Sequence, residues 1–169
     1  MAEYDVDPDS CNGGYSFVRA TSHYVSEIHT IVKAAYSKYI DRIGKEPAPM
    51  KADYNQLIES HMVYVLENDQ SGQVVGAILL RHDPAADALH IDNMVVAPAA
   101  QGRGFGHAFM ECAEDVARAC ECTNLQLYTN VKMVENLVIY PKLGFVETER
   151  RTEDGYERVY FRRDLEAGK

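Results

Sequence analysis

Hydrophobic positions along the chain follow two different periods. Seven segments are densely apolar or alternate between apolar and polar residues, which is typical of β-strands. These segments are 15–20, 61–67, 73–82, 88–98, 124–130, 145–151 and 156–163. The turn sequences NDQSG and DPAAD separate the second, third and fourth segments, and EDG joins the last two. Such short connections favour antiparallel neighbours, because a hairpin needs only a few residues.

Elsewhere apolar residues recur at the three- and four-residue spacing of amphipathic helices. The first helix follows a cap at Thr21 or Ser22 and ends within DRIGKEPAPM, and a shorter one is expected at about 51–60. A long helix follows the glycine-rich stretch after Pro98, and a short helix within MVENLVIYPKLG is closed by Pro141 and Gly144. The apolar face of the first helix is Val25, Ile28, Val32, Ala35 and Tyr39, and that of the long helix is Phe105, Ala108, Phe109, Cys112, Val116 and Ala119.

The order of these elements predicts an α/β fold. The strand–helix–strand unit from 88 to 130 favours one parallel pair within an otherwise antiparallel sheet. We therefore expect a single domain at 15–169, with a mixed, mostly antiparallel sheet and helices on both faces. Residues 1–14 are expected to form a flexible tail.

Charge and composition narrow the classes of partner. The 169 residues carry a formal net charge of −9 and a pI of about 5.1. An acidic surface repels phosphate backbones, so we expect no nucleic-acid partner. No segment approaches the roughly 18 consecutive apolar residues of a membrane span, and the acidic N-terminal sequence does not resemble a signal peptide. We expect no membrane partner and a cytoplasmic location, while a homodimer stays open.

The cysteines and histidines give no sign of a metal site. Cys11, Cys112, Cys120 and Cys122 form no CxxC pair, and no histidine stands at zinc-ligand spacing. We expect reduced, packed thiols and no metal.

The stretch QGRGFG, residues 101–106, places three glycines directly before the long helix. Glycine lets the backbone approach a ligand closely, and a helix N-terminus offers unpaired N–H groups to an anion. A Walker loop is absent, and GxGxxG fails because its sixth position would be His107 or Phe109. Without further signals, a tight strand-to-helix turn that binds nothing is the alternative.

Two motifs together resemble the GNAT superfamily of N-acetyltransferases, of bacterial type. Gln101, Gly104 and Gly106 match its acyl-CoA loop, [RQ]xxGx[GA]. Its second signature, an Asn followed four residues later by a Tyr and then by Gly-Phe, is matched by Asn136, Tyr140 and the Gly144–Phe145 pair. The order of elements resembles the family's from about Tyr15 to Leu165.

The resemblance implies acetyl-CoA as the acyl donor. The coenzyme A pyrophosphate would lie over the loop, against Gln101, Gly102, Arg103, Gly104, Phe105, Gly106 and His107. The pantetheine arm would bind the exposed backbone of Met94, Val95 and Val96 like an added strand. Asn136 would orient the cofactor, and the Tyr140 hydroxyl would protonate the leaving thiolate. A core aromatic is the structural alternative for Tyr140.

Acetyl transfer to an amine also needs a proton acceptor. His90 and Asp92 alternate with Leu89 and Ile91 on one strand, so both are expected on the same face, opposite the core. Relatives place a base or proton shuttle at these positions, and an imidazole changes charge in the neutral range. His90 would be the base and Asp92 would hold its ring or act through water. A solvated polar strand face is the alternative.

The predicted activity is direct attack of a primary amine on acetyl-CoA. A coenzyme A-binding sensor without catalysis stays open as an alternative, and so does a protein amine as the acceptor. The segment expected to wall the acceptor site, 36–54, contains both acidic and basic residues, so it does not choose between a polyamine and an amino acid.

Overall fold

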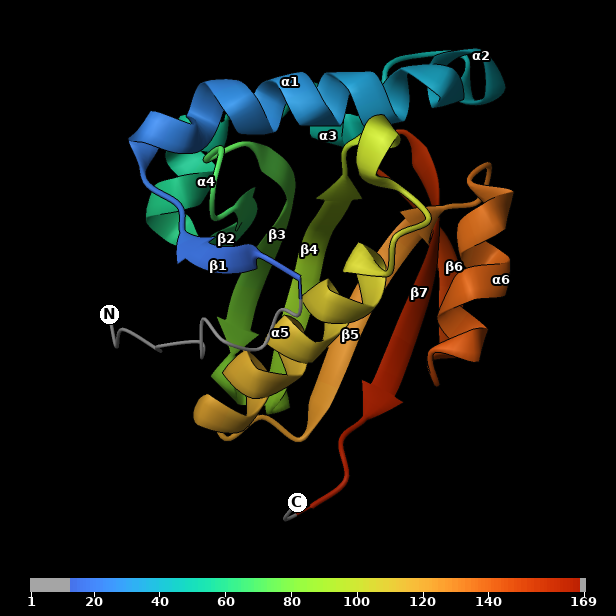
Figure 1. Cartoon of the computed structure of the whole chain (residues 1–169). Coiled ribbons are helices and arrows are strands. Elements are labelled where there is room, and N and C mark those ends of the chain that lie inside the picture. Colours follow the sequence, from blue (N-terminus) through green and yellow to red (C-terminus); the bar gives the residue numbers. More distant parts are fainter. Residues whose placement is uncertain (1–12, 168–169) are drawn as a thin grey trace.

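The computed structural model describes residues 13–167, which form one seven-stranded sheet with helices on both faces (Figure 1). The strand order is β1-β2-β3-β4-β5-β7-β6. The strands are β1 (Tyr15–Arg19), β2 (Met62–Asn68), β3 (Val74–Asp83), β4 (Ala88–Val96), β5 (Asn124–Asn130), β6 (Val146–Glu153) and β7 (Tyr156–Asp164). The helices are α1 (Val25–Tyr36), α2 (Ile40–Ile43), α3 (Ala48–Lys51), α4 (Tyr54–Ser60), α5 (Phe105–Ala119) and α6 (Val134–Lys142).

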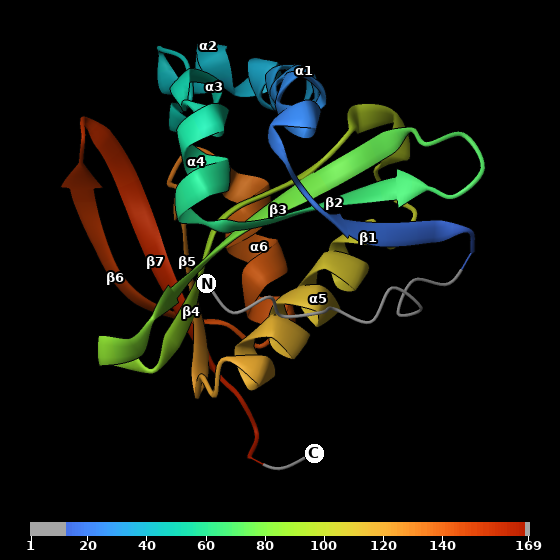
Figure 2. The same cartoon turned by 90° about the vertical axis from the view of Figure 1, so that its left-hand side faces the viewer.

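Two hydrophobic clusters sandwich the sheet. One joins α5 to the strands through Phe109, Val116 and Leu125, and α6 packs at its margin. The other joins α1 to the opposite face through Ile28 and Val32. Figure 2 shows α1–α4 on one side of the sheet and α5 and α6 on the other. The predicted fold class, seven strands and single parallel pair, β4 with β5, are confirmed.

One of the predicted helices is wrong in detail. The helix expected at about 51–60 begins later, at Tyr54, because Ala52 and Asp53 are extended, and Lys51 ends α3 instead. Asp53 caps α4 by accepting hydrogen bonds from the backbone N–H groups of Asn55 and Gln56. The short helix α6 ends at Lys142, between Pro141 and Gly144, as predicted. A proline within the last turn removes only one backbone hydrogen bond, so the helix can end a residue later.

Residues 1–12 lie outside the described residues, and with them most of the expected tail and Cys11. Cys112, Cys120 and Cys122 are buried and form no disulfide with one another. Within 13–167, no helix has both the length and the apolar composition to cross a membrane.

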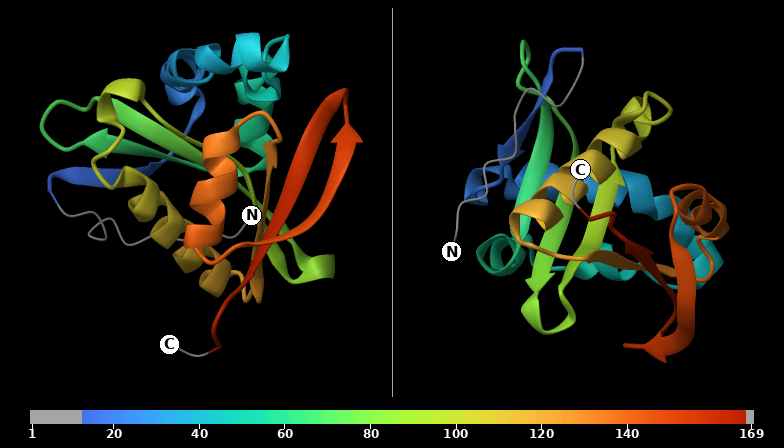
Figure 3. Two further views of the ribbon diagram at one scale, coloured as in Figure 1. Left: turned by 90° about the vertical axis from the view of Figure 1, so that its right-hand side faces the viewer. Right: turned by 90° about the horizontal axis from the view of Figure 1, so that it is seen from below.

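The pairing of β4 changes abruptly at Asp92. Towards β3, Ile91 pairs with Leu80 and Asn93 with Leu79, so Asp92 is an extra residue in a β-bulge. Towards β5, parallel pairing runs from Ala88–Asn124 to Ile91–Leu127 and stops there. Beyond this point β4 and β5 diverge (Figure 3), and the β5-facing edge of β4 from Asp92 to Val96 has no strand partner.

The bulge also decides which side chains face which helices. Leu89 and Ile91 pack in the α5 cluster, as the alternation predicts. After the bulge the order reverses, since Val95 packs in the α1 cluster while Met94 and Val96 lie against the α5 cluster. The extra residue shifts the two-residue period by one position.

Gly76 allows β3 and β4 to pack beneath α5. A Cβ at this position would lie 2.6 Å from the carbonyl oxygen of Val95 and 2.8 Å from Cε2 of Phe109. We expect Gly76→Ala to reduce the free energy of unfolding by about 1–3 kcal/mol, as overpacking does, measured by urea denaturation. Gly106→Ala is the control, because a Cβ there meets nothing within 4 Å. Equal stability of the Gly76 variant and the wild type would contradict this close packing.

Candidate active site

A cavity of about 1000 Å³ opens where β4 and β5 diverge. Its walls come from α1, the α2–α4 segment, β4, the glycine loop, β5, α6 and the β6–β7 turn. The lining includes Tyr36, Tyr54, His61, Asp92, Met94, Gln101, Gly104, Gly106, Tyr128, Asn136, Tyr140 and Arg158. Elements far apart in sequence therefore meet at one site, next to the unpaired edge of β4.

The glycine loop presents the start of α5 to this cavity. Gly104 is the N-cap residue with a φ of +85°, a left-handed conformation, and no side chain caps the helix. A Cβ on Gly102, Gly104 or Gly106 would meet no atom within 4 Å. The first N–H groups of a 15-residue helix thus lack side-chain partners and face open space. This arrangement fits a phosphate group.

Two side chains of the loop are already engaged. The Gln101 amide donates a hydrogen bond to the carbonyl of Val96 at 3.1 Å, which ties the loop to the end of β4. Arg103 donates to the Tyr15 hydroxyl at 3.1 Å and lies over the rings of Tyr15 and Phe105. Arg103 is not among the residues that line the cavity.

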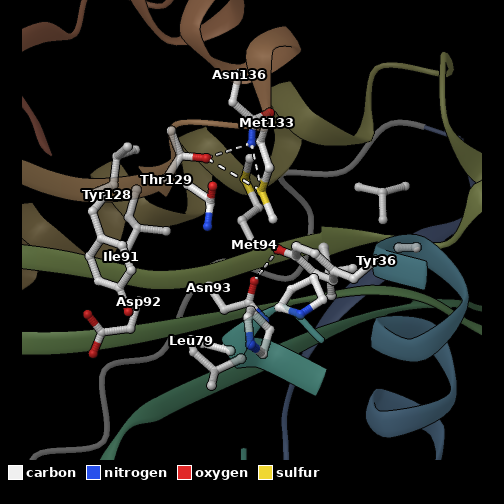
Figure 4. Close-up of a pocket in the computed structure, with 18 of the residues that line it drawn as sticks. Tyr36, Leu79, Ile91, Asp92, Asn93, Met94, Tyr128, Thr129, Met133 and Asn136 are labelled. Atoms are coloured by element: carbon white, nitrogen blue, oxygen red, sulfur yellow. Dashed lines mark hydrogen bonds between the residues drawn. The ribbon is translucent and has the colours of Figure 1, made fainter. Parts of the chain in front are cut away.

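Tyr140 and Asn136 occupy the wall formed by α6. The Tyr140 ring packs against Phe145 and Phe161 at centroid distances of 5.9 and 5.6 Å. Burial, with a smaller contribution from Tyr39, raises the pKa of Tyr140 to about 12. The hydroxyl has no hydrogen-bond partner within residues 13–167 and stays protonated at neutral pH, so it can donate a proton. The Asn136 amide donates to the Thr129 hydroxyl at 3.0 Å, which fixes α6 to β5 (Figure 4).

The structure separates His90 from Asp92 despite their shared strand face. Asp92 lines the cavity, whereas His90 does not. Nε2 of His90 lies 3.3 Å from Asp83 Oδ2 at the far end of the β3–β4 hairpin. Nε2 of His61 lies 2.7 Å from Asp92 Oδ2. The expectation that Asp92 holds the His90 ring is therefore wrong, because a histidine distant in sequence takes that place.

A group of contacts joins residues 42–46 to α6 and to the β6–β7 turn. Arg42 forms a bidentate ion pair with Glu135 of α6, with distances of 2.8 and 2.7 Å. The Lys45 ammonium donates to the carbonyl of Gly155 at 2.7 Å, and the Tyr156 hydroxyl donates to the carbonyl of Glu46 at 2.6 Å. The segment 42–46 thus bridges to α6 and to the β6–β7 turn; we call it the clasp.

Comparison with known proteins identifies the family. The family model described as an acetyltransferase (GNAT) domain matches residues 59–147, which is more than half of the chain. The chain belongs to the GNAT acetyltransferase family. The matched region contains β2 to β5, the glycine loop, α5 and α6, and so holds most of the cavity wall.

Individual GNAT relatives share only a modest part of their sequence with this chain. An IAA acetyltransferase of Azospirillum brasilense is 33% identical over 78 residues, which cover 46% of this chain and 51% of that protein, about half the length of each. The ribosomal-protein-S18-alanine N-acetyltransferase of Escherichia coli has a similar fold, with a TM-score of 0.70, 18% identity, and coverage of 92% of this chain and 96% of that one. A GNAT acetyltransferase of Elizabethkingia anophelis with acetyl-CoA bound gives a TM-score of 0.63, 18% identity, and coverage of 90% and 99%.

Two groups in this GNAT cavity were not predicted from the sequence. His61 stands at the junction of α4 and β2, and no local motif marks it. Asn93 is buried and accepts a hydrogen bond from the Tyr36 hydroxyl at 2.7 Å (Figure 4). Its Nδ2 has no hydrogen-bond partner among the described residues. The only sequence signal was the position of Asn93 next to Asp92.

Proposed function

We propose that the protein is an acetyl-CoA-dependent N-acetyltransferase that acts on a primary amine of a small molecule by direct attack. The observation that carries this proposal is the opening of three features onto one cavity: the uncapped glycine loop, the unpaired edge of β4, and the Tyr140 hydroxyl. We assign the activity to the domain predicted at 15–169.

For acetyl-CoA we propose the residues that the family resemblance indicated. Backbone N–H groups of the segment from Gln101 to His107 would hold the pyrophosphate, with Arg103 adding positive charge beside the loop. The free backbone edge of Met94, Val95 and Val96 would pair with the pantetheine arm. Unpaired N–H and C=O groups at a cavity wall favour such pairing, since they otherwise need water. Asn136 would keep α6 in register with β5.

For the chemistry, acetyl-CoA supplies an activated acetyl thioester. The amine nitrogen forms a bond to the acetyl carbon as the carbon–sulfur bond breaks, and Tyr140 donates a proton to the sulfur. A bound ammonium must first lose one proton, and the nitrogen then loses a second, which restores the Tyr140 phenol. For the first proton we propose transfer through water held by Asp92, because Asp92 lines the cavity and His90 does not.

The clasp supports a small acceptor over a protein. Arg42, Lys45 and Glu46 connect the wall formed by the α2–α3 segment to the opposite wall at α6 and the β6–β7 turn. An extended peptide would have to pass beneath these contacts or break them. A compact amine needs no such rearrangement.

Thiol release from acetyl-CoA tests the proposed function directly. We expect release with at least one compound in a panel of primary amines that includes polyamines and amino acids, and none with peptides that present a free N-terminus. Release only with peptides would identify a protein acceptor instead. Binding of acetyl-CoA without release in the presence of any amine would support the sensor alternative.

Gly106→Val tests the loop. Gly106 has space for a Cβ and no positive φ, so valine places its methyl groups where phosphate oxygens would lie without straining the backbone. We expect calorimetry to detect at least a tenfold loss of coenzyme A affinity. Glu111→Val is the matched control, because it introduces the same β-branched residue at an exposed position of α5. Unchanged affinity in the Gly106 variant would refute the loop assignment.

Tyr140→Phe tests the acid. It keeps the ring contacts with Phe145 and Phe161 and removes only the hydroxyl. We expect kcat to fall by about 10²–10⁴, the usual contribution of a positioned acid or base, with coenzyme A affinity nearly unchanged. Tyr24→Phe removes a phenol outside the cavity lining and should leave kcat as in the wild type. A wild-type kcat for Tyr140→Phe, with chemistry limiting the rate, would return Tyr140 to a packing role.

A further inference from the structure

Two histidine–aspartate pairs involve β4, but only one of them faces the cavity. His61 and Asp92 both line it, with 2.7 Å between Nε2 and Oδ2. His90 and Asp83 form the other pair, at 3.3 Å, and neither residue lines the cavity. The second pair offers a natural control for the first.

The hydrogen bonds of Asp92 converge on one of its two oxygens. Oδ2 accepts from Nε2 of His61 at 2.7 Å and from Nε of Arg81 at 3.0 Å. Oδ1 has no hydrogen-bond partner among residues 13–167 and is not sealed from solvent, since Asn93 Nδ2 is the one sealed, unpaired side-chain atom found there. A carboxylate has room for about four hydrogen bonds, so Oδ1 can accept from a ligand.

His61 is held with its ring against Asp92. Its backbone N–H donates to the carbonyl of Leu57 at 2.9 Å, and Nδ1 lies 2.8 Å from the exposed Ser60 hydroxyl. The side chain is 11% exposed, against 21% for Asp92. The imidazole therefore connects the surface to a carboxylate at the cavity, in surroundings where water screens charge only in part.

Burial and hydrogen bonding act in opposite directions on Asp92. Burial alone would raise its pKa, but the hydrogen bonds from His61 and Arg81 outweigh burial and leave the pKa below the ordinary aspartate value. Asp92 is thus an anion throughout the neutral range. With His61 neutral, Arg81 balances this anion; with His61 protonated, the three groups carry a net positive charge.

Two kinds of charged or titratable group near Asp92 keep their protonation state in the neutral range. Arginines remain charged, and burial raises the pKa of the phenols of Tyr36, Tyr54 and Tyr128. His107 of the glycine loop is the other histidine that lines the cavity. The groups on the walls around Asp92 are Tyr36 of α1, Tyr54 of α4, Arg81 of β3, Tyr128 of β5, and Arg158 of β7 with its partners Glu153 and Asp154.

We infer that Oδ1 of Asp92 binds the ammonium group of the acceptor and that His61, acting through Asp92, makes this binding depend on pH. The inference rests on the proposed function, because it identifies where the amine binds in the same cavity. This ammonium site lies at the bulge where the unpaired edge of β4 begins, so a bound amine is next to the backbone proposed for the thioester arm (Figure 4). The ligand class is a primary ammonium ion; His61 is a positioning residue.

Binding of a simple ammonium ion tests the ammonium site without requiring turnover. n-Propylammonium would be titrated into the full chain, with the backbone amide resonances of Asn93 and Met94 as reporters. We expect saturable shifts in the wild type and a dissociation constant at least tenfold larger in Asp92→Asn, because that variant loses a charge-assisted hydrogen bond. Asp83→Asn should bind as the wild type does. Equal binding by wild type and Asp92→Asn, or no saturable shift in the wild type, would overturn the inference.

The pH dependence tests His61. As pH falls and the imidazole gains a proton, ammonium binding should weaken in the wild type; in His61→Gln it should stay level, because an amide can still donate to Oδ2 but does not titrate. Kinetics with the best amine of the panel should agree, with Asp92→Asn raising the acceptor KM and not the acetyl-CoA KM. The weakening of ammonium binding at low pH should be absent in His61→Gln and present in His90→Gln. The opposite result in either variant would contradict this role. If the wild type transferred no acetyl group, the proposed function would be refuted. The ammonium site would not be, because the binding measurements do not depend on turnover.

Discussion

The site depends on one interruption of backbone pairing. Parallel hydrogen bonding between β4 and β5 ends at Ile91 and Leu127, and the strands then separate. The hydrophobic cores on both faces hold the separated strands in place, with β3 still paired to β4 as far as Val96. The unpaired edge of β4 is therefore a preformed surface with unused hydrogen-bonding capacity. A continuous sheet would have satisfied these groups and left no cavity.

The bulge at Asp92 places two kinds of surface side by side. It turns Asp92 and the neighbouring Asn93 towards α1 and α4, where Tyr36, His61 and Arg81 bind them. It also returns Met94 and Val96 to the α5 side, next to the glycine loop. One extra residue thus divides the cavity into an end suited to an anion, at the helix N-terminus, and an end suited to a cation, at Asp92.

Tyr140 lines the cavity from α6, and this helix is fixed from two sides. The hydrogen bond from Asn136 to Thr129 holds the start of the helix on β5, and packing against Phe145 and Phe161 holds its end. Glu135 of the same helix binds Arg42 of the clasp. The second sequence motif therefore positions the Tyr140 hydroxyl at the cavity and also anchors the clasp.

The sequence by itself determined the seven strands, the parallel pair, the glycine loop and the position of Tyr140 on a short helix. These features follow from local periodicity, glycine placement and two compact motifs, whose physical requirements are met within a few residues. Only the tertiary structure decided which polar groups face the cavity. Strand alternation correctly put His90 and Asp92 on one face, but it could not reveal that β5 departs after Ile91, that a bulge lies at Asp92, or that His61 and not His90 takes the aspartate. The departure of β5 and the contact of His61 with Asp92 join residues 31 or more positions apart, and the bulge is set by the pairing of β4 with β3, so no local pattern along the chain encodes these outcomes.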